Sequence, residues 1–132
     1  MVRVWVNGCF DILHRGHYEL FNYAKSLGDH LTVGIDTDEK VAQDKGPDRP
    51  YNNIEDRLYA LNSLKAIDLT YKFNTRQELI NLIEKVSPDI LVVGSDWKNK
   101  EIVGGIHAKK IVYFDRIGSY STTNILQYDH KT

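Results

Sequence analysis

The sequence has a single cysteine among its 132 residues, and this scarcity excludes an internal disulfide. It also leaves no CxxC ligand pair for a structural zinc ion. No apolar run approaches membrane-spanning length, and the N-terminus leads directly into a strand pattern without the regions of a signal peptide. We therefore expect a soluble protein that resides in the cytoplasm.

An excess of charge of either sign is also missing. The chain has 17 Lys and Arg residues against 18 Asp and Glu residues, for a formal net charge of −1 at pH 7. Such a balance does not favour a nucleic-acid surface or another polyanionic partner, so any cationic site must be local. Internal repeats and low-complexity segments are absent as well, and the length predicts one domain over residues 1–132.

Apolar, β-rich segments alternate with segments of helical periodicity along the chain. Because a strand, a helix and a strand in this order require a right-handed crossover, the sheet should be parallel. We predict a Rossmann-like, doubly wound α/β fold of about five strands, in which ligands bind beyond the carboxyl ends of the strands. The expected strands are 3–7, 30–35, 68–73, 89–93 and 110–114; the expected helices are 16–27, 54–64, 76–86 and 121–128; residues 36–39 should form an acidic turn and 40–53 a mobile loop.

His14 and His17 lie three residues apart, where the first strand leads into the first helix. A helix N-terminus has unpaired N–H groups and the positive end of the helix dipole, which favour an anion. Two imidazoles at this position predict a phosphate site, because both can donate to phosphate oxygens and stabilise the charge that develops when phosphorus is attacked. The alternatives are a solvated and a capping histidine, or a metal site.

The residues around this pair add a family resemblance. Residues 7–17 read Asn-Gly-Cys-Phe-Asp-Ile-Leu-His-Arg-Gly-His and closely resemble the G-x-F-D-x-x-H-x-G-H signature of the cytidylyltransferase-like nucleotidyltransferases. The resemblance implies an enzyme that releases pyrophosphate, with His14 and His17 as catalytic residues that stabilise the transition state. It implies nucleotide-binding roles for Cys9, Phe10, Asp11 and Gly16. The family often has Thr or Ser in place of Cys9.

The segment Gly94-Ser95-Asp96-Trp97 follows an expected strand as a tight turn. Its simpler interpretation is a β-turn in which Asp96 makes local hydrogen bonds. The segment also resembles the family's G-x-D stretch, which implies that Gly94 and Asp96 help to hold the base and ribose of the nucleotide. Trp97 is similar to the last residue of the G-D-D-W in glycerol-3-phosphate cytidylyltransferase, and we expect it near the acceptor.

Arg116 and a run of hydroxyl residues precede the expected last helix. Capping alone explains one Ser or Thr, but three hydroxyls in a row with an arginine five residues upstream indicate phosphate recognition. The segment resembles the R-T-E-G-I-S-T-T motif of the cytidylyltransferases at Arg116, Ser121 and Thr122. This resemblance implies a catalytic role for Arg116 and nucleotide binding by Ser121 and Thr122.

Lys45 lies in the expected mobile loop, either as a solvated lysine or as a flexible cation that closes over a triphosphate. Residues 45–57 resemble the K-G-x-x-R-P-x-N-x-x-E-x-R segment of heptose adenylyltransferases, which implies that Lys45 is the family's catalytic lysine. Within this match, Arg57 would either orient the loop or contact the acceptor phosphate. Together with Asp38, Arg57 is expected near the acceptor.

We expect the acceptor's phosphate oxygen to attack the α-phosphorus of the nucleotide in line, with Mg²⁺ bridging the triphosphate. Arg116 and Trp97 favour CTP as the donor, with glycerol 3-phosphate or a related polyol phosphate as the acceptor. We expect this pair of substrates. The 45–57 segment and Asn124 favour ATP with a sugar 1-phosphate such as heptose 1-phosphate. A non-catalytic nucleotide sensor is a third reading, and it would have a broken histidine pair or no lysine.

The family resemblance also predicts a homodimer. Aromatic residues between 51 and 71 are more numerous than the surface of a small monomer requires, and they are candidates for the contact between subunits.

Overall fold

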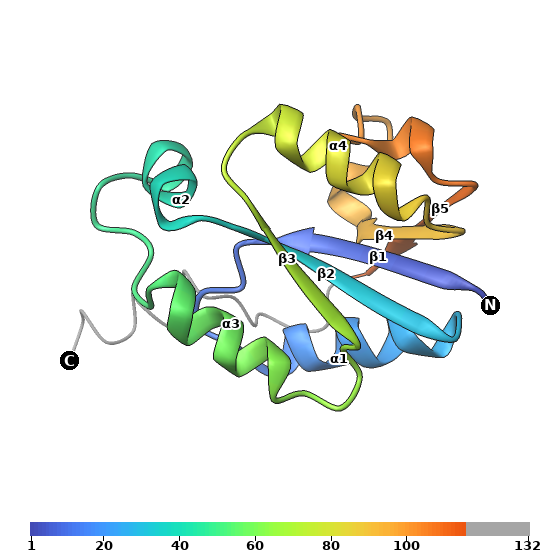
Figure 1. The fold of residues 1–132 in the computed structure, drawn as a ribbon, viewed down its shortest axis with the longest axis horizontal. Helices are drawn as coiled ribbons and strands as arrows, with labels where there is room; N and C mark the ends of the chain where they lie inside the picture. The colour runs from blue at the N-terminus through green and yellow to red at the C-terminus, as the bar shows by residue number, and fades with distance from the viewer. Residues whose placement is uncertain (116–132) are drawn as a thin grey trace.

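The computed structural model describes residues 1–115, so the expected last helix at 121–128 lies outside the described residues. Five strands form one parallel sheet in the order β3-β2-β1-β4-β5 (Figure 1). This is the Rossmann-like, doubly wound α/β arrangement that the sequence predicts. The strands are β1 (Arg3–Gly8), β2 (His30–Asp36), β3 (Leu69–Phe73), β4 (Ile90–Gly94) and β5 (Lys110–Phe114); the helices are α1 (Arg15–Ser26), α2 (Asp38–Lys45), α3 (Ile54–Asn62) and α4 (Arg76–Val86), with 3₁₀ turns η1 (Ser95–Trp97) and η2 (Gly105–His107).

Helices cover both faces of the sheet, α1 and α3 on one face and α4 on the other (Figure 1). Successive side chains of a strand point to opposite faces, and β1 follows this rule. Val4 and Val6 pack with Phe21 of α1, whereas Trp5 packs with Ile83 of α4. All five of these side chains are buried, so β1 is the central strand between two apolar layers.

The sheet changes direction of winding at β1, which lies between β2 and β4. Pairing of β1 with β2 continues to Gly8 and Ile35, but pairing of β1 with β4 ends at Trp5 and Leu91. The carboxyl end of β1 therefore has a strand neighbour on one side only. In open α/β sheets this switch point is where ligands bind, and the loop that follows β1 carries the histidine pair.

Each of the four helices begins at a residue whose side chain accepts a backbone N–H of the first turn. Such caps contribute about 1 kcal/mol each and fix where the helix starts. The capping residues are His14, Thr37, Asn53 and Thr75.

The longest of these helices, α1, has 12 residues. Within residues 1–115, no helix is long and apolar enough to cross a membrane.

The prediction of an acidic turn at 36–39 and a mobile loop from 40 is wrong, because residues 38–45 form α2. Thr37 caps this helix by accepting Lys40 N–H at 3.3 Å, and Asp38 in the first turn suits the helix dipole. Val41 is the one residue of α2 that is buried, so the apolar period that reveals a helix in a sequence is missing here. Gly46 ends the helix at φ 108°, a conformation that favours glycine, and only residues 46–53 are irregular.

Asp89 joins the amino ends of the strands on one side of the sheet. Its Oδ2 accepts Arg3 N–H at 2.8 Å, and Lys109 Nζ lies 3.1 Å from Oδ1. The Arg3 N–H, and after it the Lys109 ammonium, hold the pKa of Asp89 below its ordinary value.

We expect Asp89→Asn to lower Tm at neutral pH and to have less effect in acid. The folded pKa lies below the unfolded one, so the stabilisation is fully present above the unfolded value of about 3.9 and is lost as the pH falls through the folded value. Thermal unfolding from about pH 7 to about pH 3 measures the difference from the wild type. Asp48→Asn, at an exposed carboxylate, is the control. A difference in Tm that stays constant with pH would contradict this account.

Candidate functional site

His14 and His17 cap α1 reciprocally. Gly16 N–H donates to His14 Nδ1 at 3.1 Å, and His14 N–H donates to His17 Nδ1 at 3.3 Å. The two rings stack with centroids 3.8 Å apart. In each ring Nδ1 acts as an acceptor, so the neutral ring carries its proton on Nε2. The cap therefore orients both imidazoles, and Nε2–H is the donor of each neutral ring.

Phe10 supports the histidine pair from the β1 side. Its backbone has φ 48°, an unusual value for a residue with a side chain, and its ring turns back over Gly8. A Cβ atom at Gly8 would lie 3.0 Å from Phe10 Cζ, so a side chain there would force the Phe10 ring to shift by a few tenths of an ångström. The ring meets His17 edge-on, with centroids 5.4 Å apart, and also contacts Phe21. Phe10 thus places a buried apolar ring against His17.

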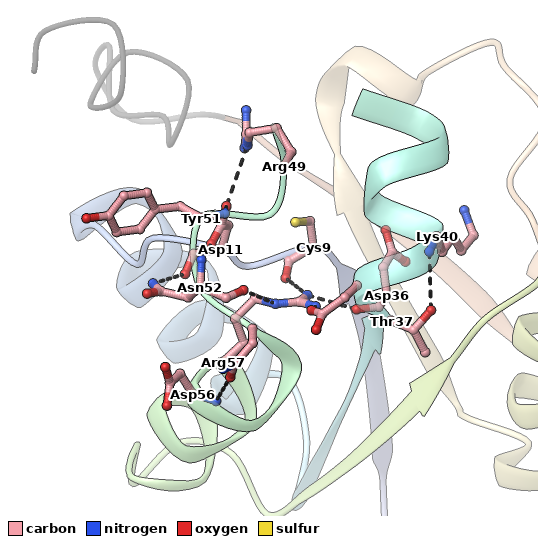
Figure 2. Close-up of polar contacts among 12 residues, drawn as sticks. Cys9, Asp11, Asp36, Thr37, Lys40, Arg49, Tyr51, Asn52, Asp56 and Arg57 are labelled. Atoms are coloured by element: carbon pink, nitrogen blue, oxygen red, sulfur yellow. Dashed lines mark hydrogen bonds and ion pairs between the residues drawn. The ribbon is translucent and has the colours of Figure 1, made fainter. Parts of the chain in front are cut away.

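Asp11 attaches the loop between α2 and α3 to the histidine loop (Figure 2). Its carboxylate is buried and accepts two backbone N–H groups, from Tyr51 at 2.6 Å and from Asn52 at 2.8 Å. The Asn52 side chain returns a hydrogen bond to the Asp11 carbonyl at 3.1 Å. Residues about 40 positions apart in the sequence are therefore held as one unit at the carboxyl end of β1.

Arg57 is the centre of a second network, and its side chain is fully buried (Figure 2). Nη1 donates to the carbonyl oxygens of Cys9 and Asp36, at 3.0 and 2.8 Å, and thus joins the ends of β1 and β2. Nε donates to the Asn52 carbonyl at 3.0 Å. Nη2 donates to Asp38 Oδ1 at 2.6 Å and fixes the first turn of α2. Of the two roles expected for Arg57, these contacts are those of a residue that orients the loop.

Lys45 is the last residue of α2 and is exposed. Burial raises the pKa of the Cys9 thiol, and the charges of Lys45 and Arg57 only partly offset this effect. Burial likewise raises the pKa of Asp36, against the opposing charges of Lys40 and Lys45. The Lys45 charge therefore acts at the carboxyl ends of β1 and β2. Because its pKa is raised, the Cys9 thiol stays protonated at neutral pH and is not a nucleophile.

The segment 94–97 lies at the carboxyl end of β4, on the same edge of the sheet, and its residues 95–97 form η1 rather than a simple turn. The Asp96 carboxylate lies against Gly94, where a Cβ atom would be 2.6 Å from Asp96 Oδ1. Trp97 is 45% exposed, and the Lys100 ammonium lies 5.7 Å from the centroid of its ring. Arg116, Ser121 and Thr122 lie outside the described residues, so their expected roles remain predictions.

Mg²⁺ also remains a prediction. Within residues 1–115, no group of three His, Cys, Asp or Glu side chains is placed to hold a metal ion. Mg²⁺ keeps several water ligands and is often bound through substrate phosphates with only one or two carboxylates.

Sequence reasoning assigned no role to Arg49 or Asn52, although both match the heptose adenylyltransferase segment. Asn52 closes the contact between Asp11 and Arg57, because it bonds to both. Arg49 forms an ion pair with Asp11, with Nε 3.5 Å from Oδ2. The R-P-x-N match was the one feature of the sequence that pointed to both residues. It indicated a loop and did not reveal which groups the two side chains contact.

Replacement of Arg57 by Met should destabilise the fold by on the order of 3 kcal/mol, because three carbonyl oxygens lose their donor. Arg57→Lys keeps the charge but cannot reach all the acceptors, so its loss should be intermediate. Urea unfolding measures both variants. Arg76→Met is the control, since Arg76 is 61% exposed and pairs with an exposed Glu101. Equal midpoints for the Met variants at 57 and 76 would refute the central role of Arg57.

Comparison with known proteins places these features in a family. The model of the cytidylyltransferase-like family matches residues 5–128. The bifunctional protein HldE of a Nitratiruptor species is 47% identical over 126 residues, which are 94% of this chain and 27% of that protein. HldE of Helicobacter hepaticus is 42% identical over 124 residues, 94% of this chain and 26% of that protein. The chain thus spans about a quarter of the length of these curated relatives.

Solved structures agree with this comparison. The lipopolysaccharide core biosynthesis protein from Thermoplasma volcanium is 28% identical with a TM-score of 0.67, over 92% of this chain and 99% of that one. A pantoate-beta-alanine ligase from Francisella tularensis, 15% identical with a TM-score of 0.58 over 98% of this chain and 69% of that one, shares the fold alone. With the family model matching nearly its whole length and the histidine pair capping α1 at the switch point of the sheet, this chain belongs to the cytidylyltransferase-like family of nucleotidyltransferases.

Proposed function

We propose that this chain transfers the adenylyl group of ATP to a sugar 1-phosphate, of the heptose 1-phosphate class, and releases pyrophosphate. This choice reverses the preference for CTP and glycerol 3-phosphate that followed from the sequence, because the comparisons favour the adenylyltransferase alternative. The reaction forms a bond between an acceptor phosphate oxygen and the α-phosphorus, and it breaks the bond from that phosphorus to the β-phosphate.

The observation that carries the proposal is the docking of the 45–57 segment against the histidine loop. This segment resembles that of heptose adenylyltransferases, and Asp11 and Arg57 build it into the carboxyl ends of β1 and β2. Of the two features that favoured CTP, Arg116 lies outside the described residues, and Trp97 is 45% exposed at η1. The Thermoplasma relative is named for lipopolysaccharide core biosynthesis.

The curated relatives are longer than this chain. The HldE proteins are bifunctional by name, and this chain corresponds to about a quarter of each. One unit of that size is expected to carry one of the two activities. The histidine pair and Lys45 are both present, which argues against a nucleotide sensor without turnover.

In this mechanism the protein positions the phosphates and stabilises charge, with no covalent intermediate on the chain. The Nε2–H groups of His14 and His17 donate to phosphate oxygens, where charge grows in the transition state. Lys45 adds a cation at the end of α2, next to the ends of β1 and β2. Mg²⁺, bound with the nucleotide, would neutralise further charge on the triphosphate.

A homodimer remains part of the proposal. Tyr51, Tyr59 and Leu69 are 70%, 79% and 42% exposed, so apolar surface is available for a contact with a second copy. Sedimentation equilibrium at micromolar concentration distinguishes a dimer from a 15.2 kDa monomer.

A pyrophosphate-release assay with the four nucleoside triphosphates and a panel of acceptors tests donor and acceptor together. We expect the highest kcat/KM for ATP with a sugar 1-phosphate, because a pocket that matches one base leaves polar groups unpaired with another. A higher kcat/KM for CTP with glycerol 3-phosphate would restore the cytidylyltransferase alternative. Absence of turnover with every pair would favour the nucleotide sensor.

His14→Asn separates the capping role of His14 from its catalytic role. Asn is a favoured N-cap residue and can accept Gly16 N–H, so the variant should unfold near the wild-type temperature. It lacks the Nε2–H donor, so kcat/KM should fall about 10²-fold or more. His14→Ala should lose the same activity and also about 1 kcal/mol of stability. Wild-type kcat/KM in both folded variants would remove His14 from the mechanism.

A further inference from the structure

Arg49 has two buried donors that no acceptor of residues 1–115 satisfies. Its side chain is only 15% exposed, and Nε and Nη2 are both buried without a hydrogen-bond partner among residues 1–115. Burial of a charged group without hydrogen-bond partners costs free energy, because the group loses its bonds to water. A buried guanidinium usually replaces those bonds with bonds to protein acceptors. Arg57 shows the contrast, because the same chemical group nearby donates to four oxygen atoms.

Asp11 pairs with Arg49 but accepts no hydrogen bond from it. The Arg49 Nε atom lies 3.5 Å from Asp11 Oδ2, and the contact is an ion pair without a hydrogen bond. Both Asp11 oxygens already accept the backbone N–H groups of Tyr51 and Asn52. Asp11 therefore balances the Arg49 charge and fixes its position, while Nε–H and Nη2–H of Arg49 have no acceptor among residues 1–115.

The place of Arg49 in the fold connects it to the nucleotide-binding loop. It lies between α2 and α3, in the segment that is bonded to Asp11. Asp11 itself lies three residues before His14 in the histidine loop. Figure 2 shows the Arg49 side chain pointing away from the Arg57 network rather than into it. The two unsatisfied atoms, Nε and Nη2, form the edge of the guanidinium whose parallel N–H bonds match two oxygens of one phosphate.

We propose that Arg49 is a substrate-binding residue that holds a phosphate group through Nε and Nη2, with Asp11 as its positioning partner. The proposal deepens the proposed function and rests on it for the identity of the substrates. The phosphate belongs to the triphosphate of the donor or to the sugar phosphate of the acceptor. Folding already removes part of the water around Arg49, so this part of the dehydration cost does not fall on the binding step. The residue is therefore preorganised for an anion.

Steady-state kinetics of Arg49→Gln, with Arg76→Gln as the matched control, tests the assignment. Both variants remove one positive charge, but Arg76 lies on α4 and is 61% exposed. In Arg49→Gln the KM of the substrate whose phosphate is bound should rise about 10-fold or more, because hydrogen bonds between charged groups are lost. The KM that rises, for ATP or for the sugar 1-phosphate, identifies the source of the phosphate. Arg49→Lys should recover part of the loss, since it keeps the charge without the fork.

Thermal unfolding of the protein without substrate excludes a purely structural role. Removal of an unsatisfied buried cation should leave Tm of Arg49→Gln near that of Arg76→Gln. A lower Tm together with unchanged KM for both substrates would overturn the proposal, because Arg49 would then serve only to hold Asp11.

A binding measurement makes this test independent of turnover. Calorimetric titration with inorganic pyrophosphate and with a sugar 1-phosphate needs no reaction between substrates. If wild-type protein turns over no ATP with any acceptor, the proposed function fails, yet weaker binding of either probe by Arg49→Gln than by Arg76→Gln still supports the phosphate site. Equal affinities of the two variants for both probes would overturn it.

Discussion

The buried guanidinium of Arg57 is the interaction on which the geometry of the site depends. A buried charge is tolerated only when acceptors surround it, and Arg57 meets this condition with three backbone carbonyls and the Asp38 carboxylate. Those acceptors come from the ends of β1 and β2, the start of α2 and the 46–53 loop. Because one rigid, planar group bonds to all of them, these segments cannot shift independently. The Arg57 side chain thus determines how these segments of the site lie relative to one another.

The histidine pair joins this framework to the chemistry. Each imidazole uses Nδ1 to accept a backbone N–H at the start of α1, so the same contact that begins the helix also orients the ring and assigns its proton. Phe10, with its positive φ and its ring against Gly8, packs under His17 and limits its movement. The site is therefore preorganised by folding, as expected for catalysis through positioning and electrostatic stabilisation.

Strong periodicity in the sequence determined the fold class and several elements. The apolar pattern of 76–86 and the β-branched run 110–114 match α4 and β5 residue for residue, because packing against the sheet requires those patterns. Helix α2 escaped prediction since its single buried residue, Val41, leaves no period to detect, and its cap at Thr37 resembled a turn. The motif around His14 and His17 likewise predicted a helix N-terminus, and α1 begins there with His14 as its cap. The phosphate site itself stays a prediction.

What the sequence could not determine are contacts between residues far apart in the chain. Arg57 lies 48 positions from Cys9 and Asp11 lies 40 from Tyr51, so no local pattern encodes either bond. Only the folded sheet decides that β1 and β2 end beside each other and bring these groups together. The sequence therefore determined the elements and the chemical groups, through local periodicity and capping. The tertiary structure decided which arginine is satisfied inside the protein and which, Arg49, keeps donors for a ligand, because that depends on the acceptors that folding places around each one.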